Sequence, residues 1–216
     1  MESEILTLHQ KTVLALVVEE IALGDFYLSG GTALAAYHLY HRKSEDLDFF
    51  TQNAVDTLFL HAFGERIKQS LEAEKVFFQR IYDRNLFQFS TSSGELKVEF
   101  TRYPFPQFEK PAIVADVRVD SLRDIAANKL MAMLDRFDPK DFADLFFILQ
   151  QFSLETLRRD AEAKFGIIID PIFLGSELVK VRRIEVLPRM LKPLILEQVK
   201  NFFLTEAKKL SSKVLE

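Results

Sequence analysis

The chain has 216 residues, 48% of them hydrophobic, and a formal net charge of −4. This length suits one domain with a helical extension or two small domains, and the apolar fraction is enough for a sizeable core. The absence of cysteine excludes disulfides and thiolate metal sites, and with a mildly negative charge any contact with nucleic acid must come from a local basic patch.

The beginning of the chain predicts a helix. The first residues, Met1-Glu2-Ser3-Glu4, lack the basic region of a signal peptide, and no apolar run approaches the roughly 20 residues of a membrane span. We therefore expect a cytoplasmic protein without a membrane partner. Residues 4–23 carry apolar side chains close to helical spacing, and Gly24-Asp25 ends that helix.

A glycine turn follows the next apolar run. Residues 26–28 predict a strand that ends at Ser29 and leads into Gly30-Gly31, where backbone N–H groups face outward with no Cβ in the way. We expect Thr32 to cap a helix that ends near residues 41–43, and the first turn of such a helix favours an anion. This stretch therefore predicts a phosphate-binding turn.

Two carboxylates separated by one residue come next. Residues 46–50 predict a strand, and alternation places Asp46 and Asp48 on the same face. Because neighbouring carboxylates resist ionising together, we expect Mg²⁺, most simply two ions, at this pair. Asp-x-Asp alone equally describes a polar strand face. Its combination with the glycine turn, all between residues 26 and 50, favours metal-assisted chemistry on a phosphate.

The middle of the chain predicts a helix and a meander of strands. Residues 54–73 form an amphipathic pattern, and the period then changes to two over residues 75–82, 86–91 and 95–102. Prolines break regular structure across residues 103–112, so we place a boundary there between domains 1–112 and 113–216. A short strand is expected near residues 117–119.

The remainder of the chain predicts helices. Ser121-Leu122-Arg123-Asp124 resembles a capping box that opens a helix to about Arg136, and Asp138-Pro139 opens another. Further helices are expected near residues 153–164, 171–186 and 192–210. The predicted fold class is α+β, with a mixed sheet flanked by helices and followed by an all-helical C-terminal domain.

A two-metal site usually takes a third acid, as a metal ligand or as the base for the attacking hydroxyl. Glu99 is our choice, because alternation on its strand turns it away from the apolar side of Leu96, Val98 and Phe100. The alternative is an exposed polar strand face, which also explains Glu95.

Cations on the next helices are predicted to hold the nucleotide. Lys129 and Arg136 are seven residues apart and share a helix face, where they would contact the triphosphate. A solvated helix face explains such a pair equally well. Asp141 either stabilises the start of its own helix or orients Lys129 or the bound nucleotide. Asp144, one turn further on, is a lesser candidate. The histidines form no convincing ligand set, and P-loop, Rossmann and nucleophile-elbow motifs are absent.

The stretch from Gly30-Gly31-Thr32 through His41-Arg42-Lys43-Ser44-Glu45-Asp46-Leu47-Asp48 resembles the minimal nucleotidyltransferases of the AbiEii/AbiGii toxin family, related to DNA polymerase β-type enzymes. The resemblance is traceable through about residue 150. It supports Glu99 in Lys97-Val98-Glu99-Phe100, then Lys129, Arg136 and Lys140-Asp141 in that order. Arg42 and Ser44 would shape the loop over the site, with Ser44 near a phosphate or a metal-bound water.

The predicted reaction moves a nucleoside monophosphate from an NTP to an acceptor hydroxyl and releases pyrophosphate. The resemblance implies a toxin of a toxin–antitoxin or phage-defence pair, the tRNA 3′ end as acceptor, and a separately encoded antitoxin. A protein hydroxyl or a small molecule such as an aminoglycoside remains an alternative acceptor. A further alternative is a nucleotide-binding or protein-interaction module whose chemistry is weak or lost. The two are distinguished by whether Lys129, Arg136 and Lys180-Val181-Arg182-Arg183 face the same cleft as Asp46 and Asp48.

Overall fold

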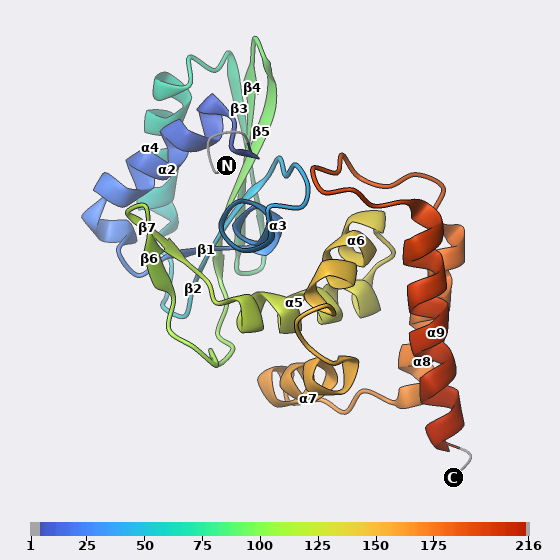
Figure 1. Ribbon diagram of the computed structural model, residues 1–216. Helices are drawn as coiled ribbons and strands as arrows, with labels where there is room; N and C mark the ends of the chain where they lie inside the picture. Colours follow the sequence, from blue (N-terminus) through green and yellow to red (C-terminus); the bar gives the residue numbers. More distant parts are fainter. Residues whose placement is uncertain (1–4, 215–216) are drawn as a thin grey trace. The chain divides into compact units, whose positions relative to one another are not determined.

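The computed structural model describes residues 5–214, with side chains through residue 210. Packing divides the chain into two units (Figure 1). The first unit contains the described residues up to Tyr40 and the segment Ser44–Ser121. The second contains Leu122 onward together with His41–Lys43, which are separated from it by about a third of the sequence. No helix in the described part of the chain is long and apolar enough to cross a membrane.

The first unit is built on a seven-stranded mixed sheet with the order β3-β4-β5-β2-β1-β7-β6. The strands are β1 (Tyr27–Ser29), β2 (Leu47–Thr51), β3 (Lys75–Ile81), β4 (Arg84–Thr91), β5 (Gly94–Arg102), β6 (Ala112–Val114) and β7 (Val117–Val119). Strand β2 pairs parallel with β5 and antiparallel with β1, whereas β1 pairs parallel with β7. Strands β3, β4 and β5 form an antiparallel meander. The predicted mixed sheet is confirmed, and β6 and β7, which follow the proline-rich segment, belong to it.

The two longer helices of the first unit, α2 (Leu8–Glu19) and α4 (Thr57–Ser70), begin at side-chain caps. The unit also contains the 3₁₀ turn η1 (Ile21–Leu23), α3 (Gly30–Ala33) and the π-helix η2 (Leu34–Leu39). Thr7 and Gln10 form a reciprocal capping box at α2, and the Asp56 carboxylate accepts from two backbone N–H groups at α4. The predicted helix over residues 4–23 is thus a helix and a 3₁₀ turn; residue 4 lies outside the described residues.

Phenylalanine fills the space between the β2–β5 sheet and α4. Phe49 stacks on Phe100 at 5.2 Å between ring centroids, and Phe63 of α4 meets Phe100 edge-on. Gly64 lets α4 approach the ring of Phe87, because a Cβ at this position would overlap that ring. These contacts bury one side of the strands, as the period-two pattern predicted.

Two expectations around the glycine turn are wrong. Thr32 is not a helix cap, because Ser29 precedes the first helical residue and Thr32 lies inside α3. The helix also ends earlier than residues 41–43. Tyr40 adopts the left-handed conformation that ends η2 after Leu39, and Arg42 forms a β-bridge with Met190 instead.

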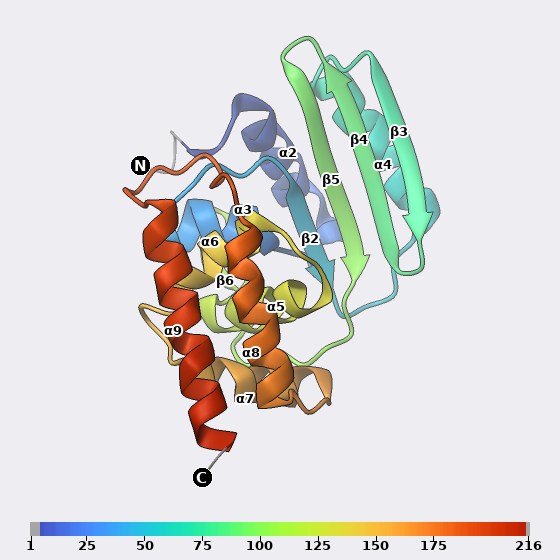
Figure 2. The same cartoon turned by 90° about the vertical axis from the view of Figure 1, so that its right-hand side faces the viewer.

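The second unit is helical, as predicted. Its helices are α5 (Leu122–Asp135), α6 (Pro139–Ile148), α7 (Leu154–Phe165), α8 (Pro171–Val179), the 3₁₀ turn η3 (Lys180–Arg183) and α9 (Leu196–Val214). Asp138 caps α6 with Pro139 at its first position, as the sequence predicts. Helices α8 and α9 lie side by side in both views (Figures 1 and 2). The ring of Phe142 meets Phe203 edge-on at 5.2 Å, which packs α6 against α9.

Candidate active site and charge network

The glycine turn lies directly against the carboxylate pair. Gly30 has φ +67°, which strains any residue with a side chain, and a Cβ built on it would overlap the carboxylate of Asp48. Ser29 pairs in register with Asp48 across β1 and β2. Only glycine at position 30 therefore allows both the turn and the Asp48 side chain to occupy this place.

Polar contacts hold the segment that carries the acids. The Thr32 hydroxyl donates to the backbone carbonyl of Asp46, the residue just before β2. The buried side chain of Gln10 on α2 donates to the carbonyls of Ser44 and Glu45, at 3.0 and 3.2 Å. Ser44 and Asp46 are thus held through their backbone carbonyls, by the side chains of Gln10 and Thr32 respectively. Gln10 is a support that the sequence did not reveal.

A buried aspartate fixes the residue that precedes the turn. The Asp120 carboxylate accepts from the Ser29 hydroxyl at 2.7 Å, and both side chains are buried. The Asp120 N–H donates to the Leu28 carbonyl, and the His38 imidazole bonds the Asp120 carbonyl at 2.8 Å. The end of β7 therefore anchors both the entry to the glycine turn and the helix that follows it.

Glu99 stands next to Asp48, as predicted, but its oxygens have other partners. Strands β2 and β5 place Asp48 and Glu99 in register. The Arg84 guanidinium donates to both oxygens of Glu99 at 2.6 and 2.8 Å, and the Thr101 hydroxyl donates at 2.6 Å. Burial opposes the charge of Glu99, yet these donors outweigh it and lower its pKa.

The acids of this region fit Mg²⁺ as a pair. In the part of the chain that the structure describes, no three histidine or carboxylate side chains gather closely enough to hold a metal ion. Mg²⁺ commonly takes one or two protein carboxylates and fills its remaining positions with water and substrate phosphates. Asp46 and Asp48, both half-exposed beside the glycine turn, offer that donor set.

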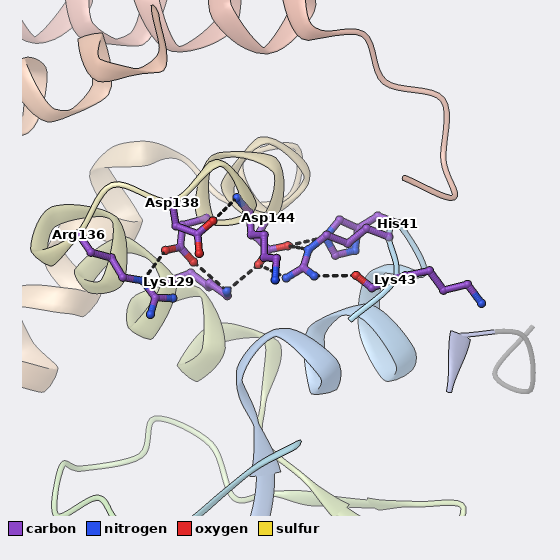
Figure 3. A network of polar contacts seen from close by, with 9 residues as sticks. His41, Lys43, Lys129, Arg136, Asp138 and Asp144 are labelled. Atoms are coloured by element: carbon purple, nitrogen blue, oxygen red, sulfur yellow. Dashed lines mark hydrogen bonds and ion pairs between the residues drawn. The ribbon is translucent and has the colours of Figure 1, made fainter. Parts of the chain in front are cut away.

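Basic side chains of segment 41–43 and of α5 meet at one buried carboxylate in the second unit, Asp144 (Figure 3). Asp144 is fully buried and accepts from Arg42 Nε and Nη2 at 2.6 and 2.8 Å, and it bonds His41 Nε2 at 2.7 Å. Lys129 Nζ lies 2.6 Å from its second oxygen. Asp144 thereby ties segment 41–43 to helices α5 and α6.

The partners of Asp144 keep its carboxylate ionised, whereas His41 is held neutral. Burial acts against ionisation of Asp144, but Lys129 and Arg42 hold its pKa well below the ordinary value. Burial lowers the pKa of His41 despite its bond to Asp144. The second ring nitrogen of His41, Nδ1, is buried without a hydrogen-bond partner among the described residues. A neutral His41 that donates through Nε2 suits both facts.

Asp141 joins the same network from the first turn of α6. Its carboxylate accepts from Lys129 at 3.0 Å and from Arg136 at 3.1 Å. Its position in the first turn also favours the helix start, so both predicted explanations apply. Lys129 keeps a raised pKa because Asp144 and Asp141 outweigh its burial.

The structure thus gathers the predicted site residues in two groups. The first unit holds Gly30, Gly31, Thr32, Ser44, Asp46, Asp48 and Glu99; the second holds Arg42, Lys129, Arg136 and Asp141. Sequence reasoning gave Asp144 a minor place and missed Arg84. Arg84 fell in a predicted turn, although the pairing of β4 with β5 would have placed it diagonal to Glu99.

Comparison with known proteins gives consistent matches. A family model described as "Nucleotidyl transferase AbiEii toxin, Type IV TA system" matches residues 14–202. The uncharacterized protein aq_aa25 of Aquifex aeolicus (strain VF5) is 30% identical over 175 residues, which cover 77% of this chain and 79% of that protein.

Solved structures share the fold. JHP933 from Helicobacter pylori superposes with a TM-score of 0.57 at 24% identity, over 95% of this chain and 91% of its own. MenT4, a nucleotidyltransferase toxin from Mycobacterium tuberculosis H37Rv, superposes with a TM-score of 0.58 at 16% identity, over 94% and 81%.

Proposed function

The chain belongs to the AbiEii family of nucleotidyltransferase toxins, and from that premise we propose that Asp46 and Asp48 bind Mg²⁺ together with an NTP. The observation that carries this proposal is the contact of Gly30 with the Asp48 carboxylate, which brings a phosphate-binding turn against a metal-binding acid. Mg²⁺, when bound, supplies neutralisation of phosphate charge and polarisation of a phosphoryl oxygen.

The residues of the first unit have distinct tasks in this proposal. Backbone N–H groups of Gly30 and Gly31 hold the outer phosphates, and Thr32 keeps the segment of Asp46 in place. The acceptor oxygen attacks the α-phosphorus, the bond from that phosphorus to the bridging oxygen breaks, pyrophosphate leaves, and the hydroxyl proton passes to solvent. Glu99 was predicted as ligand or base; its lowered pKa disfavours the base, because a base works best near the operating pH.

The second unit contributes cations in this proposal. Lys129 and Arg136 remain our predicted contacts for nucleotide phosphates, with Asp141 as the residue that orients both side chains. The acceptor that we propose is the 3′ hydroxyl of tRNA, which the resemblance of residues 26–50 implies. Membership of a Type IV toxin–antitoxin family also gives the protein an antitoxin partner, which we propose is separately encoded.

The test is transfer of label from each α-labelled NTP to total cellular RNA in the presence of Mg²⁺. We expect label on RNA of tRNA size, and a loss of more than about a hundredfold in Asp48→Asn. Asp116→Asn is the matched control, because it makes the same change at an exposed turn position of the same unit. Removal of divalent ions with EDTA should abolish transfer, and added Mg²⁺ should restore it.

Each other outcome has a definite meaning. Label on protein keeps the chemistry and changes the acceptor. NTP binding without any labelled product indicates that this site binds nucleotides but does not catalyse their transfer. Full transfer by Asp48→Asn, or transfer that EDTA leaves unchanged, contradicts the proposed metal site.

A further inference from the structure

The meander β3–β5 has one buried and one exposed face. Phe87 and Phe89 on β4 are buried toward α4, which lies behind these strands in Figure 2. Alternate residues point the other way, and we call the exposed side that carries Phe77, Arg84 and Lys97 the meander face. Phe77 is 63% exposed on it, and the side chains of Arg84 and Lys97 are 50% and 35% exposed.

Two cations on the meander face share one buried acid. Arg84 bonds Glu99 with two hydrogen bonds, and Lys97 Nζ lies 3.6 Å from the same carboxylate. Glu99 therefore fixes both cations in position while neutralising only one of their charges. Glu99 accepts from Nε and Nη2 of Arg84, so Nη1 of this half-exposed guanidinium is not used by Glu99, and its flat geometry suits a phosphate. Glu95, the other acid of this strand face, hydrogen-bonds the neutral Gln88 and keeps its charge. The exposed Lys75 lies in the same cross-strand row as Glu95, through Ser90, so three cations of the meander face stand against two acids.

The meander face continues the proposed active site across neighbouring strands. Asp48 is in register with Glu99. The hydrogen bonds of Glu99 are the main cause of the raised pKa of Arg84, and the charge of Asp48 adds to it. Phe77 lies in the same cross-strand row as Lys97, through Gln88 between them. Cations that bind phosphates beside an exposed aromatic ring are the usual elements of a single-strand nucleic-acid site.

We propose that the meander face binds the single-stranded 3′ end of the RNA acceptor, with Arg84 and Lys97 on its phosphates and Phe77 stacked on a base. The inference rests on the proposed function, because it names where the acceptor of that reaction binds. Glu99 acts in it as the anchor of Arg84 and Lys97. The excess of one positive charge on the meander face, the exposed ring of Phe77 and the continuity with Asp48 favour single-stranded nucleic acid over an apolar protein surface.

The test measures binding of a fluorescein-labelled single-stranded RNA by anisotropy over a range of salt concentrations, without NTP. Arg84→Gln and Lys97→Gln should each reduce the slope of log K against log salt by about 0.7 for the phosphate contact that is lost. Phe77→Leu should raise Kd about tenfold and leave the slope unchanged. Arg80→Gln is the matched control, because Arg80 is exposed on β3 with its side chain on the opposite face.

Two further variants guard against a folding defect. Arg84→Lys keeps the charge and should keep the salt slope, while Arg84→Gln combined with Glu99→Gln removes both members of the ion pair and should bind as weakly as Arg84→Gln alone. Equal effects of Arg84→Gln and Arg80→Gln, or RNA binding that none of these changes weakens, would overturn the proposal. Because binding is measured without transfer, a wild-type protein that binds RNA but transfers nothing refutes the proposed reaction and not this surface.

Discussion

Replacing Asp144 with asparagine tests whether the buried charge network holds the second unit together. The carboxylate of Asp144 is fully buried and faces three cationic or hydrogen-bonding partners, of which Arg42 is only 2% exposed. Asparagine keeps the shape but removes the charge and one acceptor oxygen. Breaking a buried ion pair on one side typically costs about 3–5 kcal/mol, because the remaining charge stays desolvated.

That loss is large on the scale of the whole protein. Domains of ordinary stability unfold with about 5–15 kcal/mol, and each kcal/mol moves the melting temperature of a chain of this size by roughly 2–4 °C. We therefore expect Asp144→Asn to melt about 6–20 °C below the wild type. Urea unfolding followed by circular dichroism gives the free energy directly.

The matched control is Glu155→Gln, which removes a carboxylate that pairs with Arg158 and Arg159 on the surface of α7. Exposed ion pairs contribute at most about 1 kcal/mol, so this change should lower the free energy of unfolding by less than that. A loss of less than 1 kcal/mol in Asp144→Asn, or a loss no larger than in Glu155→Gln, would refute the reasoning.

The same carboxylate predicts a dependence on acid. Because the pKa of Asp144 is lowered in the folded protein, its contribution is complete above the unfolded pKa of about 3.9 and is lost as pH falls toward the folded value. Asp144→Asn should therefore flatten the decline of stability with acid below about pH 4. An unchanged acid limb would contradict this assignment.

Three further changes test single features. Gly30→Ala should abolish transfer and destabilise the fold, because its Cβ would overlap Asp48. Gly166 has nearly the same φ but no atom near the position of a Cβ, so Gly166→Ala should cost only about 1 kcal/mol and keep activity. Urea unfolding and label transfer are measured for both variants. Burial lowers the pKa of His41, so it stays neutral in the folded protein, while in the unfolded chain the same histidine takes up a proton near pH 6.5. The wild type should therefore lose stability between about pH 7 and pH 5, and His41→Gln should reduce that loss. Urea unfolding at several pH values measures it. Asp56→Ala should cost about 1 kcal/mol in urea unfolding through loss of the α4 cap.

Local patterns in the sequence predicted most of the first unit. Alternation of apolar residues located β3, β4 and β5, and the buried Leu96, Val98 and Phe100 fell on the expected face. The same alternation placed Glu99 on the opposite face of its strand, where the structure has it. Predictions of this kind succeed because the period of a strand depends only on neighbours along the chain.

Contacts between distant residues could not be predicted in the same way. Arg42 and Asp144 are 102 positions apart, and nothing in His41-Arg42-Lys43 distinguishes an extended segment of the second unit from the last turn of a helix. Thr32 looks like a cap because its hydroxyl suits that place, yet its partner is the carbonyl of Asp46. Tertiary partners decided each of these cases, and local propensity did not.

The membership of His41–Lys43 in the second unit has a consequence for any attempt to divide the protein. A fragment that begins at Leu122 would lack the backbone that bridges Met190 and the guanidinium that Asp144 binds. On the ribosome, Arg42 must wait until about a hundred further residues have been made before its carboxylate partner exists. As a separate polypeptide the helical half therefore lacks part of its own interior, and a coexpressed first half would have to supply residues 41–43.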